Sequence, residues 1–332
     1  MRITTNMIMR NYQNNLYDNL GGLESARKQV ESEQRVLSAY EDPGAAANAS
    51  VIKHRYSHNE DYLNNLSSVD KWFMAQESAL YQVGQIATQI GDQYGVEAAT
   101  DTMSSEGRDT YAEQLRNLQN TMVQFMNSKF GDTFVLGGNT GTNEAPFELT
   151  DDGKLLYRGY DVDDPAVQAE LDRLAAETSY VDIGYGMTFN GANIISSTAL
   201  DGALPGINAV GYGLTADGTS KNLIVLAGQM ADVLEADTFD RDEYEKLWTQ
   251  FQEAANDLQD SLTQIGTKTN MVENTISKLE DEQIALQELL NDEIGIDPAL
   301  AITNYSYAMY TYNSALKIGT GILGPSLLDF LA

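Results

Sequence analysis

The chain has 332 residues, 42% of them hydrophobic, which is enough for a packed core and for two or three domains. Its net charge of −29 excludes the clustered lysines and arginines of a nucleic-acid surface. The absence of cysteine excludes disulfides, thiolate nucleophiles and zinc–thiolate sites.

The charge is unevenly distributed along the chain. Residues 1–60 hold seven basic and seven acidic side chains, so the net charge of −29 comes from the residues that follow. A neutral terminus can pack against copies of itself, whereas an acidic middle suits a solvated outer surface. The opening residues lack the basic segment and apolar run of a secretory signal peptide, and no apolar run is long enough for a membrane span. We therefore expect another export route if the protein leaves the cell.

Heptad spacing predicts an assembly helix over residues 1–40. Its apolar residues recur every seven positions in one narrow stripe: Met9, Leu16, Leu23, Val30 and Leu37. Gly21 and Gly22 each weaken such a helix by about 1 kcal/mol relative to alanine. A long helix with so thin an apolar stripe needs a partner.

A first part of a helical core is predicted over residues 41–136. Asp42 can cap its first helix, and Pro43 suits the first helical position. Apolar residues spaced by three and four then indicate two helices, one carrying Leu66 to Tyr94 and the other Tyr111 to Phe125.

A β-rich outer domain is predicted over residues 137–219. Glycine and turn residues crowd its start, and the turn at 151–153 lies between two short apolar runs that predict a β-hairpin. Asp164 and Pro165 predict the start of a short helix. The remaining glycine-rich stretches predict strand or loop.

Helix returns over residues 220–294, the second part of the helical core, where Asp240 and Glu243 suggest a capping box. The break at 295–298 resembles the one at 41–44. The C-terminal assembly helix and tail, residues 295–332, carry the apolar positions Tyr305, Met309, Tyr312, Leu316, Leu328 and Phe330.

This layout predicts a mainly α fold, in which both chain ends form a long helical coiled-coil stalk and a small β-rich domain is inserted at its far tip. Chain ends are usually polar, so an apolar end indicates a partner surface. We therefore expect the apolar residues of both terminal helices to pack between subunits rather than to do chemistry.

Three patterns were weighed for chemistry. His54 and His58, four apart on a helix and near Asp61, could bind a metal but lack a clear third ligand. Residues 211–216 match a loose dinucleotide fingerprint without its βαβ surroundings. The acidic clusters 161–164 and 237–245 lack EF-hand spacing. We expect no enzyme activity, no cofactor and no metal; a secreted calcium-binding protein or an enzyme with its site in the β insert is the alternative from another class.

Five segments resemble the bacterial flagellin and hook-associated family. The opening residues 1–7 look like that family's start, and residues 38–46 are similar to its S-x-x-x-[D/E]-D-P-x-x-A break. The other segments lie near the insert and at the C-terminus: 136–138 followed by 146–147 and 156–159, then 312–316, and 327–331. The ending Leu-Leu-Asp-Phe-Leu favours the junction proteins of this family, with filament flagellin as the alternative.

The resemblance implies a flagellin-like fold and a structural role outside the cell. Such proteins leave the cell through the flagellar type III export pathway and fold their terminal helices on assembly. The implied partners are further copies of the chain in a ring at the hook–filament junction, the other hook-associated junction protein, hook protein or flagellin neighbours, and an export chaperone. No nucleic acid or membrane is expected to bind.

Overall fold

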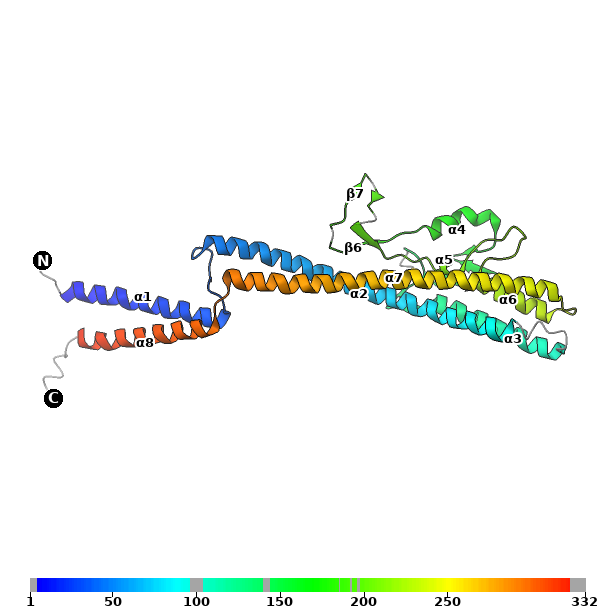
Figure 1. Ribbon diagram of the computed structural model, residues 1–332. Coiled ribbons are helices and arrows are strands. Elements are labelled where there is room, and N and C mark those ends of the chain that lie inside the picture. The colour runs from blue at the N-terminus through cyan, green and yellow to red at the C-terminus, as the bar shows by residue number, and fades with distance from the viewer. Residues whose placement is uncertain are drawn as a thin grey trace. The chain divides into compact units, whose positions relative to one another are not determined.

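The computed structural model describes residues 5–95, 104–139, 144–184, 186–191, 193–195 and 198–322. The chain is mainly helical, with small antiparallel sheets inserted in its middle, as predicted. It divides into two compact units (Figure 1), which are described separately below.

Unit 1 comprises Met1–Glu60 and Glu280–Ala332, and therefore unites the two ends of the chain. Helices α1 (Thr5–Ser32) and α8 (Pro298–Ile322) pack against each other. α1 ends at Ser32, so Leu37 lies beyond the helix that was expected to carry it. The helix ends there because Glu33, the next residue, adopts the left-handed backbone conformation, with a φ of 53°.

The two breaks that flank the terminal helices hydrogen-bond to each other. The Arg35 backbone N–H donates to the Ile294 carbonyl (2.7 Å), and the Ile296 N–H donates to the Glu33 carbonyl (3.1 Å). A small apolar cluster lies beside them: Val36, Ala45, Ala49 and Ile294. The two breaks thus form one structural feature, although about 260 positions of chain separate them.

Unit 2 comprises Asp61–Leu279, and two long helices, α2 (Pro43–Tyr94) and α7 (Arg241–Ile294), contribute residues to both units. Within unit 2, α3 (Ser105–Met126) packs against α6 (Leu223–Glu235). The contact includes a buried hydrogen bond from the Gln119 amide to the Ile224 carbonyl (3.0 Å). The helices share one apolar core with the β insert.

Short polar side chains begin these helices, as the sequence indicated. Asp42 Oδ1 accepts a hydrogen bond from the Ala45 N–H (3.0 Å) at the start of α2, and Asp240 Oδ1 accepts from the Glu243 N–H (3.1 Å) at the start of α7. The cap of α6 is Asn222, which was not predicted; its Oδ1 accepts from two backbone amides of the first turn.

The β insert consists of very short antiparallel strands. β1 (Lys129–Phe130) pairs with β2 (Thr133–Phe134) just before it, and the predicted hairpin is β3 (Phe147–Leu149) with β4 (Leu155–Tyr157), extended by β5 (Tyr160–Asp161). Two further pairs are β6 (Tyr180–Asp182) with β9 (Ala199–Asp201), and β7 (Phe189–Asn190) with β8 (Asn193–Ile194). Short helical segments complete the insert: η1 (Pro165–Val167), α4 (Gln168–Ala175) and α5 (Ile207–Val210).

The insert lies along the side of the helices rather than at the far tip, which corrects the prediction. Ile183 and Leu200, next to and within the β6–β9 pair, pack against Phe73 of α2 and Val272 of α7. Figure 1 shows the insert following the helices of unit 2 in this way. The apolar faces of its short strands are too small to form a separate core, so they are buried against the helices.

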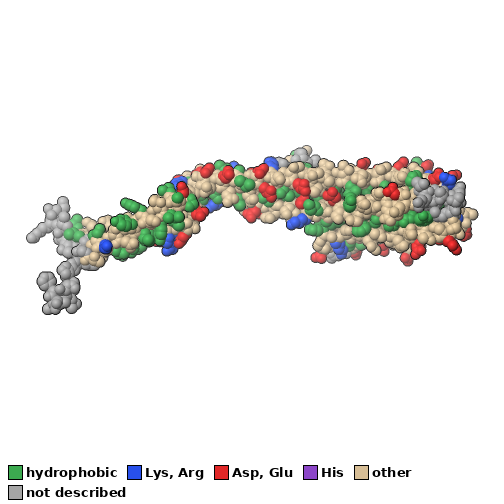
Figure 2. Space-filling model, turned by 60° about the horizontal axis from the view of Figure 1, so that its bottom comes forward, with side chains coloured by type: hydrophobic (Ala, Val, Ile, Leu, Met, Phe, Trp, Pro, Cys, Tyr) green, Lys and Arg blue, Asp and Glu red, His purple; other side chains and the backbone are tan. Residues whose placement is uncertain are grey.

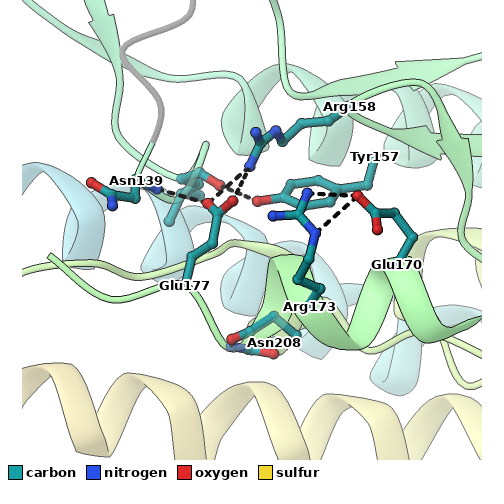
Figure 3. A network of polar contacts seen from close by, with 9 residues as sticks. Asn139, Tyr157, Arg158, Glu170, Arg173, Glu177 and Asn208 are labelled. Carbon is teal, nitrogen blue, oxygen red and sulfur yellow. Dashed lines mark hydrogen bonds and ion pairs between the residues drawn. The ribbon is translucent and has the colours of Figure 1, made fainter. Parts of the chain in front are cut away.

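A half-buried ion pair joins the hairpin to the end of α4 (Figure 3). Arg158 Nη1 donates to both carboxylate oxygens of Glu177 (3.0 and 2.9 Å), and the Asn139 backbone N–H donates to Glu177 Oε2 (3.0 Å). Gly138 has a φ of +80°, and a Cβ there would lie 2.6 Å from Glu177 Oε2. We call the pair Arg158–Glu177 the insert clamp, because it joins three segments that the sequence separates.

Candidate functional site

The paired terminal helices α1 and α8 carry the candidate site, an assembly surface. They run antiparallel: the breaks meet at one end, and Tyr12 contacts Gly319 near the other. The side of α1 that faces α8 is half-buried or buried at every third or fourth residue: Met9, Tyr12, Leu16, Asn19, Leu23, Ala26 and Val30. This is the spacing of a coiled-coil seam.

The opposing seam of α8 consists mainly of small residues and tyrosines. Its buried or half-buried positions again follow spacings of three and four: Ala301, Tyr305, Ala308, Tyr312, Ala315 and Gly319. A Cβ at Gly319 would collide with the Tyr12 hydroxyl. Small side chains therefore allow the two backbones to approach closely, and the larger apolar side chains of α8 point elsewhere.

The structure divides the predicted assembly residues into four groups. Leu37 is half-buried and lies beyond the end of α1. Those that face inward and are partly covered by the partner helix are Met9, Leu16, Leu23, Val30, Tyr305 and Tyr312. Met309 and Leu316 face outward and are 45% and 41% exposed. Leu328 and Phe330 lie outside the described residues. That any of these residues contacts another subunit stays a prediction.

The outer faces of both helices expose further apolar residues that the sequence reasoning missed. On α8 they include Leu300, Ile302, Tyr307, Tyr310 and Ile318, and on α1 Met7, Ile8, Tyr17 and Leu20. Figure 2 shows hydrophobic side chains on the surface of this helix pair with few charged ones among them. Heptad periodicity does not indicate them, because they lie outside the single apolar stripe of each terminal helix.

The composition of α8 contains the signal that would have identified this surface. Its 25 residues include a single charged side chain, Lys317. A helix that is apolar on all sides is normally buried, whereas a solvated surface helix has a charged face. Most of the exposed large hydrophobic side chains among the described residues lie in unit 1, although unit 2 is larger. Exposed apolar side chains gathered in this way are typical of protein interaction sites.

The histidine pair and the glycines at 211 and 213 lie in the described part of the chain. The rings of His54 and His58 have centroids 4.5 Å apart and are tilted by 41° to each other, and the described residues contain no group of three or more metal-ligating side chains. Gly211 and Gly213 have φ values of +82° and +80°, and a Cβ at Gly211 would lie 2.4 Å from the Lys221 carbonyl oxygen. Among the described helices, none is long and apolar enough to cross a membrane.

The acidic cluster at 161–164 forms a hydrogen bond and an ion pair within unit 2. Asp163 Oδ1 accepts a hydrogen bond from the Ser220 hydroxyl (2.8 Å), and the Lys154 ammonium pairs with Asp161 (2.8 Å). Burial raises the pKa of Asp163 to about 6. The ionised carboxylate of Asp163 is therefore less favourable in the folded chain than in the unfolded one.

This shift predicts a stability that falls as pH rises. The folded-state pKa of Asp163 lies above its ordinary value of 3.8, so the folded chain binds more protons than the unfolded chain between about pH 4 and 6, and the ionised Asp163 destabilises the fold above that window. We expect Asp163→Asn to raise the melting temperature at pH 7.5 and to flatten its dependence between pH 4 and 6, as measured by circular dichroism. The exposed Glu148→Gln is the control; an equal effect there would contradict the assignment.

Comparisons with known proteins agree with this geometry. A family model described as the bacterial flagellin N-terminal helical region matches residues 3–139. This segment is similar to the flagellin N-terminal helical region. The predicted resemblance to the flagellin and hook-associated family is thereby confirmed.

The relatives include proteins of the hook-associated group. Flagellar hook-associated protein 3 of Salmonella typhimurium is 25% identical over 153 residues, which is 46% of this chain and 48% of that protein. The chain thus matches about half the length of this curated relative.

Solved structures share the fold of the chain. The flagellar junction protein FlgL from Legionella pneumophila has a TM-score of 0.55 at 13% identity, covering 74% of this chain and 99% of that one. FlgL from Bacillus cereus has a TM-score of 0.52 at 16% identity, covering 73% and 99%. At these identities the likeness concerns the fold.

Proposed function

We propose that the protein is a structural subunit of the bacterial flagellum that joins the hook to the filament and assembles through its terminal helix pair. The observation that carries the proposal is the apolar surface of α8, which exposes Ile302, Tyr307, Met309, Tyr310 and Leu316 with one charged residue in the whole helix. Fully burying a large apolar side chain stabilises an assembly by about 1.5–3 kcal/mol. Several such side chains together can offset the entropy lost when subunits associate.

The proposed partners follow from the family resemblance. They are further copies of the chain in a ring, the other hook-associated junction protein, neighbouring hook protein or flagellin, and an export chaperone. The proposed location is the extracellular hook–filament junction, reached by flagellar type III export. The absence of cysteine is compatible with passage through a narrow channel in an unfolded state, because no disulfide can form before export.

Immunogold electron microscopy of intact flagella tests the position in the flagellum. An antibody raised against the described insert segment 144–184 is applied to flagella of the source bacterium and of a deletion strain. We expect label in one narrow band at the hook–filament boundary, and none in the deletion strain. Label along the whole filament would make the chain a filament flagellin, and flagella without label would reopen the possibility of a secreted binding protein or enzyme.

A further inference from the structure

A basic stripe lies on the exposed side of α2 in unit 1. Val51, His54, Arg55 and His58 are spaced by three, one and three residues, which places them on one face of the helix. All four are exposed, and Val51 is 55% exposed. The buried positions of the same helix segment, Ala45, Ala49 and Asn59, lie on another face. Arg55 gives this face a positive charge in a chain with a net charge of −29. We call the four residues the basic stripe.

An acidic stripe lies on the end of α7 in the same unit. Asp281, Glu288 and Asp292 are spaced by seven and four residues, so they share one exposed face of the helix. Ile284 and Leu289 flank them and are 60% and 54% exposed. No lysine, arginine or histidine occurs between Leu279 and Leu316, and the nearest basic residue before this stretch is Lys278, three residues before Asp281.

Each stripe lies away from the buried seam of its own helix. The seam of α7 in unit 1 runs through Leu286 and Ile294, which are buried and lie on the side opposite Asp281 and Glu288. The basic stripe of α2 likewise lies away from its own buried residues. Each stripe is therefore presented outward, with opposite charge and with exposed apolar side chains beside it.

We propose that the two stripes are the two halves of one lateral interface between neighbouring copies of this chain, with Arg55, His54 and His58 of one copy facing Asp281, Glu288 and Asp292 of the next. Val51 packs against Ile284 and Leu289 in this arrangement. The interface is heterologous, because each copy contributes a different surface on each of its two sides. A heterologous interface forms a closed ring when the rotation that relates neighbouring copies brings the last copy back to the first. The inference rests on the proposed assembly and adds the surfaces that neighbouring copies use.

The charged residues and the apolar residues of the two stripes contribute to this interface in different ways. Exposed charge pairs contribute little to affinity, but they steer association and fix the register between partners. The apolar flanks supply the area that excludes water. Because exposed charges are screened by salt, lateral association should weaken as the ionic strength rises.

Cross-linking between copies tests the interface, since the natural chain contains no cysteine. Full-length Val51→Cys and Ile284→Cys proteins are mixed, assembled at low salt onto isolated hooks and oxidised. We expect a disulfide between the two variants in assembled material, at least tenfold above the yield from the control mixture of Val51→Cys with Tyr81→Cys. Tyr81 is also exposed on α2 but belongs to unit 2.

Charge reversal supplies the second arm. In the cysteine-bearing proteins, Arg55→Glu added to the Val51→Cys copy or Glu288→Arg added to the Ile284→Cys copy should each lower the cross-link yield at least fivefold, and the combination should restore it. Circular dichroism checks that each exposed substitution leaves the fold unchanged. Undiminished yields, or a control yield equal to that of the test pair, would overturn the interface.

Sedimentation of the same samples separates this inference from the proposed function. Subunits that assemble on hooks but give no specific cross-link would overturn the lateral interface and leave the flagellar role in place. Wild-type chains that never associate with hooks or with one another would overturn both.

Discussion

Replacing Tyr307 and Tyr310 of α8 by aspartate is expected to abolish assembly while the monomer stays folded. The two side chains are 73% and 72% exposed, so the folded monomer loses no packing when they change. In an assembly they would be buried, and removing a central interface tyrosine typically costs about 2 kcal/mol or more. Burying two carboxylates adds a further cost, because their charge is desolvated. We therefore expect the assembled fraction to fall at least a hundredfold.

Analytical ultracentrifugation and binding to isolated hooks measure this loss, and thermal unfolding measures the monomer. The matched control is Tyr81→Asp on α2, which changes a tyrosine that is 55% exposed in unit 2. We expect this control to assemble normally. An assembly defect of equal size in the control, or normal assembly of the α8 variant, would contradict the assignment of the surface to the terminal helix pair.

Removing the acidic half of the insert clamp is expected to destabilise unit 2. In the Glu177→Ala variant, the Arg158 guanidinium loses two hydrogen bonds and the Asn139 backbone N–H loses its acceptor. The side chains of Arg158 and Glu177 are only 19% and 14% exposed, so water replaces the lost carboxylate incompletely. A buried polar group left without its partner costs about 1–3 kcal/mol. We expect a loss of this size in the free energy of unfolding, measured by urea denaturation.

The neighbouring Glu170–Arg173 pair provides the control for this effect. It joins two residues three apart on α4, and Figure 3 shows it beside the clamp. Glu170→Ala removes the same charge from an exposed pair, so we expect little change in stability. Glu177→Gln keeps one acceptor oxygen and should give an intermediate loss. Equal losses of unfolding free energy in the Glu177→Ala and Glu170→Ala variants would contradict a specific stabilising role of the insert clamp.

The features predicted from sequence are those that depend on residues close together in the chain. Asp42 and Asp240 cap their helices as expected, because a capping side chain bonds to an amide a few residues away. The hairpin of β3 and β4 follows from the turn between them. The heptad stripe of α1 was recognised because its apolar residues repeat along one helix, and four of its five residues do lie toward α8.

The candidate site was only partly predictable for the same reason. The stripe residues Tyr305 and Tyr312 face α1, whereas Met309 and Leu316 face outward, and spacing alone could not separate the two sets. The distinction depends on which side of α8 the partner helix occupies. The composition of α8 was a second signal, because the helix has only one charged residue. Only the structure showed that its large apolar side chains are exposed.

Sequence by itself determined the helices, their caps, the breaks and the location of the β insert in the chain, because hydrogen bonds and side-chain periodicity act over a few residues. Tertiary structure decided that the break at Arg35 pairs with the one at Ile294, that the insert lies along the helices, and that Arg158 meets Glu177. It also decided which apolar residues of α8 are left uncovered. These outcomes depend on contacts between residues far apart in the chain, and local pattern does not specify which distant surfaces meet.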